Sequence, residues 1–65
     1  MQNNNIKKIR NSKNITLERL AEISGVSIGY LCHLEKGTRD NPSMHIMEKI
    51  AMGLQKTVIE VFFEK

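Results

Sequence analysis

The 65 residues suffice for one small domain whose core must use nearly every apolar side chain, which excludes a second catalytic domain and makes a solvent-excluded enzyme pocket hard to build. Ten lysines and arginines against seven acidic residues give a net charge of +3, with the basic excess in residues 1–39, a modest indication of an anionic partner. The single cysteine cannot form an internal disulfide and no apolar run approaches a membrane span or a signal peptide, so we expect a cytoplasmic protein.

The N-terminal segment predicts a basic helix. We expect residues 1–4 to be frayed and a helix to run from about Asn4 to Lys13, with Ile6 and Ile9 facing inward. Its cations have no acidic neighbour, which suits either a solvated surface or a helix near phosphates. These cations are Lys7, Lys8, Arg10 and Lys13.

Residues 16–37 organise the chain and begin with a short helix that ends at a glycine. Thr16 is a favourable N-cap for this helix, Thr16 to Ser24. Gly25 stops it, because glycine takes the left-handed conformation without a Cβ penalty. The expected inward positions are Leu17, Leu20, Ala21 and Ile23.

The helix that follows, about Ser27 to Lys36, has an unusual outward face. Ser27 caps it, and Leu31 and Leu34 continue the inward line that Val26 begins. The opposite side is neither charged nor conventionally solvated and carries Ile28, Gly29, Cys32 and His33. Two helices joined by a short glycine-containing turn, the second with such a face, are typical of the helix-turn-helix of DNA-binding proteins.

The C-terminal part predicts a loop and two more helices. Thr38 to Pro42 is a run of turn residues, and Ser43 is a good cap for a helix that continues to about residue 54, with Gly53 weakening its end. Its expected inward positions are Met44, Met47, Ile50, Ala51 and Leu54. Thr57 and Glu60 form the pattern of a capping box for a last short helix over residues 58–62. The inward side chains of that last helix are Val58, Val61 and Phe62.

From Ile6 to Phe63 the chain resembles the Cro and lambda-repressor type of helix-turn-helix proteins, also called the Xre family. The resemblance rests on several short motifs that occur together in register. They are Ile-x-x-x-Arg at residues 6–10, Thr-Leu-Glu-x-Leu-Ala at 16–21, Ser-Gly-Val-Ser at 24–27, Tyr-Leu-x-x-Leu-Glu-x-Gly at 30–37, Asn-Pro-Ser at 41–43 and Ile-Ala-x-x-Leu at 50–54. The resemblance implies an all-α fold, a compact bundle of five helices in which residues 1–65 form a single DNA-binding domain.

The resemblance also implies which residues would meet DNA. The second helix of the unit would enter the major groove with a face that lacks the Gln, Arg or Asn of many family members. The base-facing residues would be Ser27, Ile28, Gly29, Cys32 and His33. Phosphates would be bound by Thr16, Leu17, Tyr30, Lys36, Thr38, Arg39 and Asn41. Arg10 and Glu35 match positions that form a structural ion pair in family members.

Other chemistry finds little support in the sequence. Cys32, His33 and His45 do not have the spacing of a metal site, so we expect no metal, no cofactor and no enzyme activity. Cys32 as a redox switch is a further idea that nothing beyond the basic setting supports.

Three apolar side chains left over by the predicted core, Ile46, Ile59 and Phe63, indicate a homodimer interface. The main hypothesis is therefore a bacterial or phage-encoded transcription regulator, a dimeric repressor that binds a palindromic operator in double-stranded DNA. The alternative is a protein-interaction module, such as an antitoxin or anti-repressor, with a protein antagonist as its partner. The weak hydrogen-bonding capacity of Ile28, Gly29 and Cys32 motivates this alternative.

Overall fold

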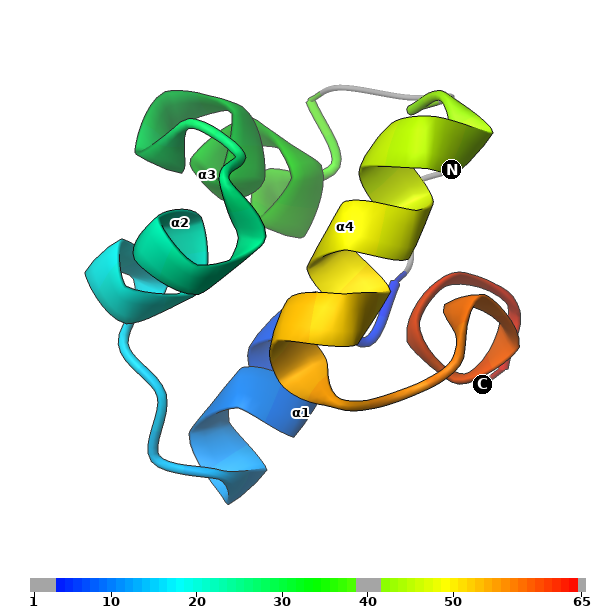
Figure 1. The fold of residues 1–65 in the computed structure, drawn as a ribbon, viewed down its shortest axis with the longest axis horizontal. Helices are drawn as coiled ribbons and strands as arrows, with labels where there is room; N and C mark the ends of the chain where they lie inside the picture. Colours follow the sequence, from blue (N-terminus) through cyan, green and yellow to red (C-terminus); the bar gives the residue numbers. More distant parts are fainter. Residues whose placement is uncertain (1–3, 39–41, 65) are drawn as a thin grey trace.

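The computed structural model describes residues 4–38 and 42–64. They form α1 (Ile6–Ser12), α2 (Leu17–Ser24), α3 (Ile28–Lys36), α4 (Met44–Leu54) and a final π-helix, η1 (Ile59–Phe63), without a strand in this part of the chain. The expected all-α fold of five helices is confirmed. In Figure 1, α4 crosses the middle of the molecule, with α2 and α3 on one side of it and η1 on the other.

Local signals in the sequence determine where the helices begin and end, and the predicted bounds agree to within two residues. Thr16, Ser27 and Ser43 each accept a hydrogen bond from the backbone N–H three residues later, at 3.0, 3.2 and 3.2 Å. Gly25 and Gly37 have φ angles of +73° and +78°, so the left-handed conformation ends α2 and α3.

The capping box at the start of the last helix is confirmed. Thr57 donates its backbone N–H to Glu60 Oε1 at 2.9 Å, and Glu60 donates its own N–H to Thr57 Oγ1 at 3.1 Å. The helix that follows is wider than an α-helix, because Glu64 N–H donates to the carbonyl of Ile59, five residues earlier, at 2.9 Å.

The core lies between α4 and the other helices. Its fully buried side chains are Ile6, Leu20, Leu31, Leu34, Ile50, Leu54 and Val61. Two predicted inward residues are not part of it, since Ile23 and Met44 are 40% and 55% exposed. Ser24 and Ile23 of α2 both lie next to Gly53 of α4, but only Ser24 is buried, and the buried residues of α4 begin at Met47.

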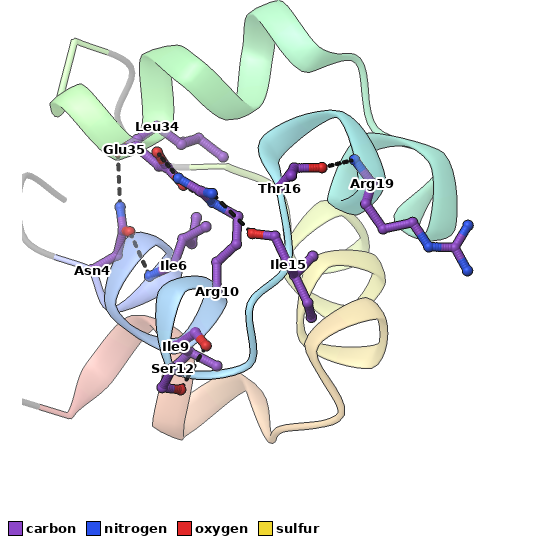
Figure 2. Close-up of polar contacts among 10 residues, drawn as sticks. All are labelled: Asn4, Ile6, Ile9, Arg10, Ser12, Ile15, Thr16, Arg19, Leu34 and Glu35. Atoms are coloured by element: carbon purple, nitrogen blue, oxygen red, sulfur yellow. Dashed lines mark hydrogen bonds and ion pairs between the residues drawn. The ribbon is translucent and has the colours of Figure 1, made fainter.

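The start of α1 is held by two asparagines, so the expectation of a frayed segment is wrong for Asn4; residues 1–3 lie outside the described part. Asn4 Nδ2 donates to the carbonyl of Leu34 at 2.9 Å, and its Oδ1 accepts from Ile6 N–H at 3.1 Å (Figure 2). Asn5 bonds to η1 instead: its Nδ2 donates to the carbonyls of Glu60 and Glu64 at 2.9 and 2.7 Å. The first turn is thereby tied to the end of α3 and to the tail.

Candidate nucleic-acid interface

The outward face of α3 is largely exposed to solvent. Four of the five predicted base-facing residues are exposed, namely Ser27, Ile28, Gly29 and His33, while Cys32 is half-buried with a free thiol. Leu31 and Leu34 are buried on the opposite side and fix the rotation of the helix about its axis. The helix is therefore anchored by one face and presents the other to solvent.

The N-terminus of α2 is a second exposed feature. Thr16 Oγ1 accepts from Arg19 N–H, which leaves the N–H groups of Leu17 and Glu18 without an intrahelical acceptor, as in any first turn. The side chain of Leu17 packs against the core, so its backbone N–H is what it can offer to an anion. Glu18 adds a negative charge in this turn that weakens the attraction.

The remaining predicted phosphate-binding residues differ in their surroundings. Lys36 is exposed at the end of α3, whereas Tyr30 is half-buried and packs against the core. The hydroxyl of Thr38 already forms contacts with His33, since its Oγ1 lies 2.8 Å from His33 Nδ1 and 3.2 Å from the His33 carbonyl oxygen. Arg39 and Asn41 lie outside the described residues.

The expected ion pair between Arg10 and Glu35 is present and bidentate. Arg10 Nε and Nη2 donate to the two carboxylate oxygens of Glu35 at 2.9 and 3.2 Å, and Nη1 donates to the carbonyl of Ile15 at 2.9 Å (Figure 2). The two side chains are only 13% and 10% exposed. One guanidinium thus joins α1, the segment before α2 and the C-terminal half of α3.

Exposed cations gather on α1 and at the start of α2. Lys7 and Lys8 on α1 and Lys13 just after it are exposed, and no acidic residue lies on that helix. Arg19 is a cation that the sequence reasoning omitted: it lies in the first turn of α2, points away from the bundle in Figure 2 and forms an exposed ion pair with Glu22. Its place three residues after a predicted N-cap was the signal that could have found it.

Two apolar side chains of η1 are exposed, as expected for an interface. Ile59 and Phe63 are 61% and 58% exposed. Ile46, the third residue expected at the interface, is half-buried and packs against the core, so it exposes less apolar surface than the other two. Among the described residues, no group of three or more His, Cys, Asp or Glu side chains is placed to bind a metal ion, and no helix is long and apolar enough to cross a membrane.

Known proteins are similar to this chain in sequence and in fold. A family model described as "Helix-turn-helix" matches residues 6–61. The chain is 37% identical over 60 residues to the HTH-type transcriptional regulator SinR of Bacillus subtilis and 35% identical over 57 residues to SlrR of the same organism. These matches cover 92% and 88% of this chain but only 54% and 38% of the relatives, so the chain spans about half or less of their length.

Solved structures agree. The restriction-modification controller protein C.AhdI from Aeromonas hydrophila superposes with a TM-score of 0.81 and 32% identity, covering 88% of this chain and 85% of that one. The clp gene regulator ClgR from C. glutamicum gives a TM-score of 0.76 and 34% identity over 85% of this chain and 70% of its own.

Proposed function

Because the chain belongs to the Cro and lambda-repressor type of helix-turn-helix proteins, a family of DNA-binding transcription regulators, we propose that it is a repressor. In this proposal the protein is cytoplasmic and bacterial or phage-encoded, and it binds a palindromic operator as a homodimer. In this proposal α3 lies in the major groove of double-stranded DNA. The N-terminus of α2 binds a phosphate on one flank, and Lys36 binds one on the other.

One observation carries the proposal: α3 exposes one face to solvent, while the packing of its opposite face fixes the rotation of the helix about its axis. Leu31 and Leu34 are at most 1% exposed, and the Arg10–Glu35 pair holds the same helix near its C-terminal end. A helix inserted in the major groove must keep its register relative to the flanking phosphate contacts. The first turn of α2, with its unpaired N–H groups, supplies such a contact on the adjacent helix.

The palindromic operator follows from the proposed homodimer. Ile59 and Phe63 expose apolar surface on η1, and burying it against a second copy would relate two α3 helices by a two-fold axis. Two such helices would meet half-sites about one DNA turn apart, roughly 34 Å.

A protein-interaction module is the second candidate. The face of α3 favours it, since Ile28 is 42% exposed and neither Gly29 nor Cys32 carries a group for bidentate recognition of a base. In that case the same face would bind a protein antagonist, and affinity for DNA would be weak and without sequence preference.

Selection of bound DNA from a random pool, followed by sequencing at two salt concentrations, separates the two candidates. A palindromic motif with affinity that falls steeply as salt rises is expected for the regulator. Salt-dependent binding without a motif, or no binding, would contradict the proposal and favour the interaction module.

A further inference from the structure

Building on the proposed function, we propose that Thr38 fixes the tautomer of His33, so that the Nε2 atom of the neutral ring faces DNA as a hydrogen-bond acceptor. The side chain would then select, at one position of the operator, a base with an exocyclic amino group. His33 becomes the main specificity-determining residue of a face that is otherwise poor in hydrogen-bonding groups, and Thr38 becomes its positioning residue.

The direction of the hydrogen bonds follows from counting hydrogens. Thr38 Oγ1 lies 3.2 Å from the carbonyl oxygen of His33, which has no hydrogen to give, so in this contact the hydroxyl donates. The hydroxyl then has only lone pairs left for its second neighbour, His33 Nδ1, at 2.8 Å. With its one hydrogen given to the carbonyl, the hydroxyl accepts from the ring, and the proposal accordingly assigns the hydrogen to Nδ1.

The number of ring hydrogens also determines the protonation of the opposite ring nitrogen, Nε2. A neutral imidazole carries one N–H, so hydrogen on Nδ1 leaves Nε2 with a lone pair and no hydrogen. Among the described residues, no hydrogen bond to His33 Nε2 is present, and the residue is exposed. The atom that the ring presents to a ligand is therefore an acceptor.

The backbone at the end of α3 holds this arrangement in place. Gly37 has a φ of +78°, its N–H donates to the carbonyl of Leu34 at 3.2 Å, and Thr38 N–H donates to the carbonyl of His33 at 3.0 Å. This pair of bonds brings Thr38 back over the last turn, within reach of the ring five residues earlier. The hydroxyl is thus placed by the helix terminus itself.

An acceptor at this place distinguishes bases in the major groove. Adenine N6 and cytosine N4 present amino hydrogens there, whereas guanine and thymine present only acceptors. A donating Nε2–H would instead bind the acceptors of guanine and thymine, and also adenine N7, so only cytosine would lack a partner for it. Ile28, Gly29 and Cys32 offer no strong competing hydrogen bond, so the preference at this position should depend on the imidazole.

Two measurements test the inference. The first is a nitrogen-15 NMR correlation spectrum of the His33 ring in the DNA-free protein at about pH 8.5, above the range in which histidine side chains ordinarily titrate. We expect hydrogen on Nδ1 in the wild type and in Thr38→Ser, and a mixture of tautomers in Thr38→Val. Hydrogen predominantly on Nε2 in the wild type would overturn the proposal, whether or not the protein binds DNA.

The second measurement is selection from random DNA at the same pH, with His33→Ala locating the position concerned. At that position we expect adenine or cytosine over guanine or thymine by about fivefold, retained in Thr38→Ser and largely lost in Thr38→Val. A motif with guanine or thymine there, or one unchanged in Thr38→Val, would overturn this inference and leave the proposed function intact. If the wild type selects no motif, the proposed function is overturned instead. The inference that His33 selects a base is then overturned as well.

Discussion

Gly53 of α4 lies directly against Leu20 of α2: a Cβ atom added to Gly53 would be 3.2 Å from Leu20 Cδ1 and 3.3 Å from Ser24 Cβ. Leu20 is fully buried and Ser24 nearly so, so neither can move aside freely. The absence of a side chain at Gly53 therefore lets α2, the first helix of the helix-turn-helix, approach the central helix closely. The weakening of α4 expected from this glycine is offset by that contact.

Gly53→Ala should destabilise the protein although alanine is the better helix former. The gain in helix propensity is about 1 kcal/mol, whereas overpacking of a core contact costs about 1–3 kcal/mol. Denaturant unfolding followed by circular dichroism measures the difference. Gly29→Ala is the matched control, because an added Cβ on Gly29 meets nothing within 4 Å, and there we expect a stabilisation of about 0.5–1 kcal/mol. A stabilised Gly53→Ala would show that α2 can shift.

Glu35→Gln should lower the stability of the bundle, because it removes the charge that partners a largely buried guanidinium. Loss of charge-assisted hydrogen bonds of this kind costs about 1–3 kcal/mol, or a decrease in Tm of roughly 10 °C in a domain of this size. Thermal melting checks this, with Glu22→Gln in the exposed Arg19 pair as a control that should change little. Equal effects of the two substitutions would contradict a structural role for the Arg10–Glu35 pair.

Glu60 should make the stability depend on pH. The hydrogen bond from Thr57 N–H, the Thr57 hydroxyl contact and the nearby charge of Lys56 lower the pKa of Glu60. Since the carboxylate is favoured in the folded state, its stabilisation is present above the ordinary glutamate range and is lost as pH falls through the lowered pKa.

Glu60→Gln isolates this effect, because glutamine keeps the acceptor oxygen of the capping box but not the charge. The wild type should have the higher Tm at about pH 7, and the difference should shrink as pH falls through the lowered pKa of Glu60. Glu48→Gln, which removes an exposed carboxylate from α4, corrects for the change in net charge. A difference in Tm that is constant with pH would refute a charge effect at Glu60.

Ile59→Lys combined with Phe63→Lys should convert the proposed dimer to monomers, since two charges would have to be buried against the partner copy. Sedimentation equilibrium should then give the mass of one chain, 7.5 kDa, where the wild type gives twice that value. Met44→Lys serves as the control, because Met44 is similarly exposed on a different helix. An intact dimer in the double variant would exclude η1 as the interface.

The sequence allowed most of the fold to be predicted because its helix boundaries are encoded locally. Thr16, Ser27 and Ser43 cap within three residues of themselves, and Gly25 and Gly37 adopt positive φ at the ends of α2 and α3. Such signals need no knowledge of the tertiary structure. The Arg10–Glu35 pair was reached differently, through resemblance to a family, since its partners are 25 residues apart.

The structural features that the sequence did not predict depend on contacts between residues that are far apart in the chain. Periodicity marks Ile23 as a core residue, but whether it or Ser24 is buried depends on where α4 passes. A polar start such as Asn4 is typical of a frayed end until the carbonyl of Leu34 is known to lie 2.9 Å from its amide. The 2.8 Å approach of Thr38 Oγ1 to His33 Nδ1 likewise requires coordinates. The residues that contact bases and phosphates remain predictions, because no DNA contact has been tested.

The bonds from Asn5 to Glu60 and Glu64 also bear on the time course of folding. They join residues 55 and 59 positions apart, so forming them closes a loop that contains nearly the whole domain. Closing so long a loop is entropically unfavourable until other contacts have shortened it, which places this step late. During synthesis, α2, α3 and α4 can pack as they leave the ribosome, whereas the bonds of Asn5 cannot form until Glu60 and Glu64 have emerged.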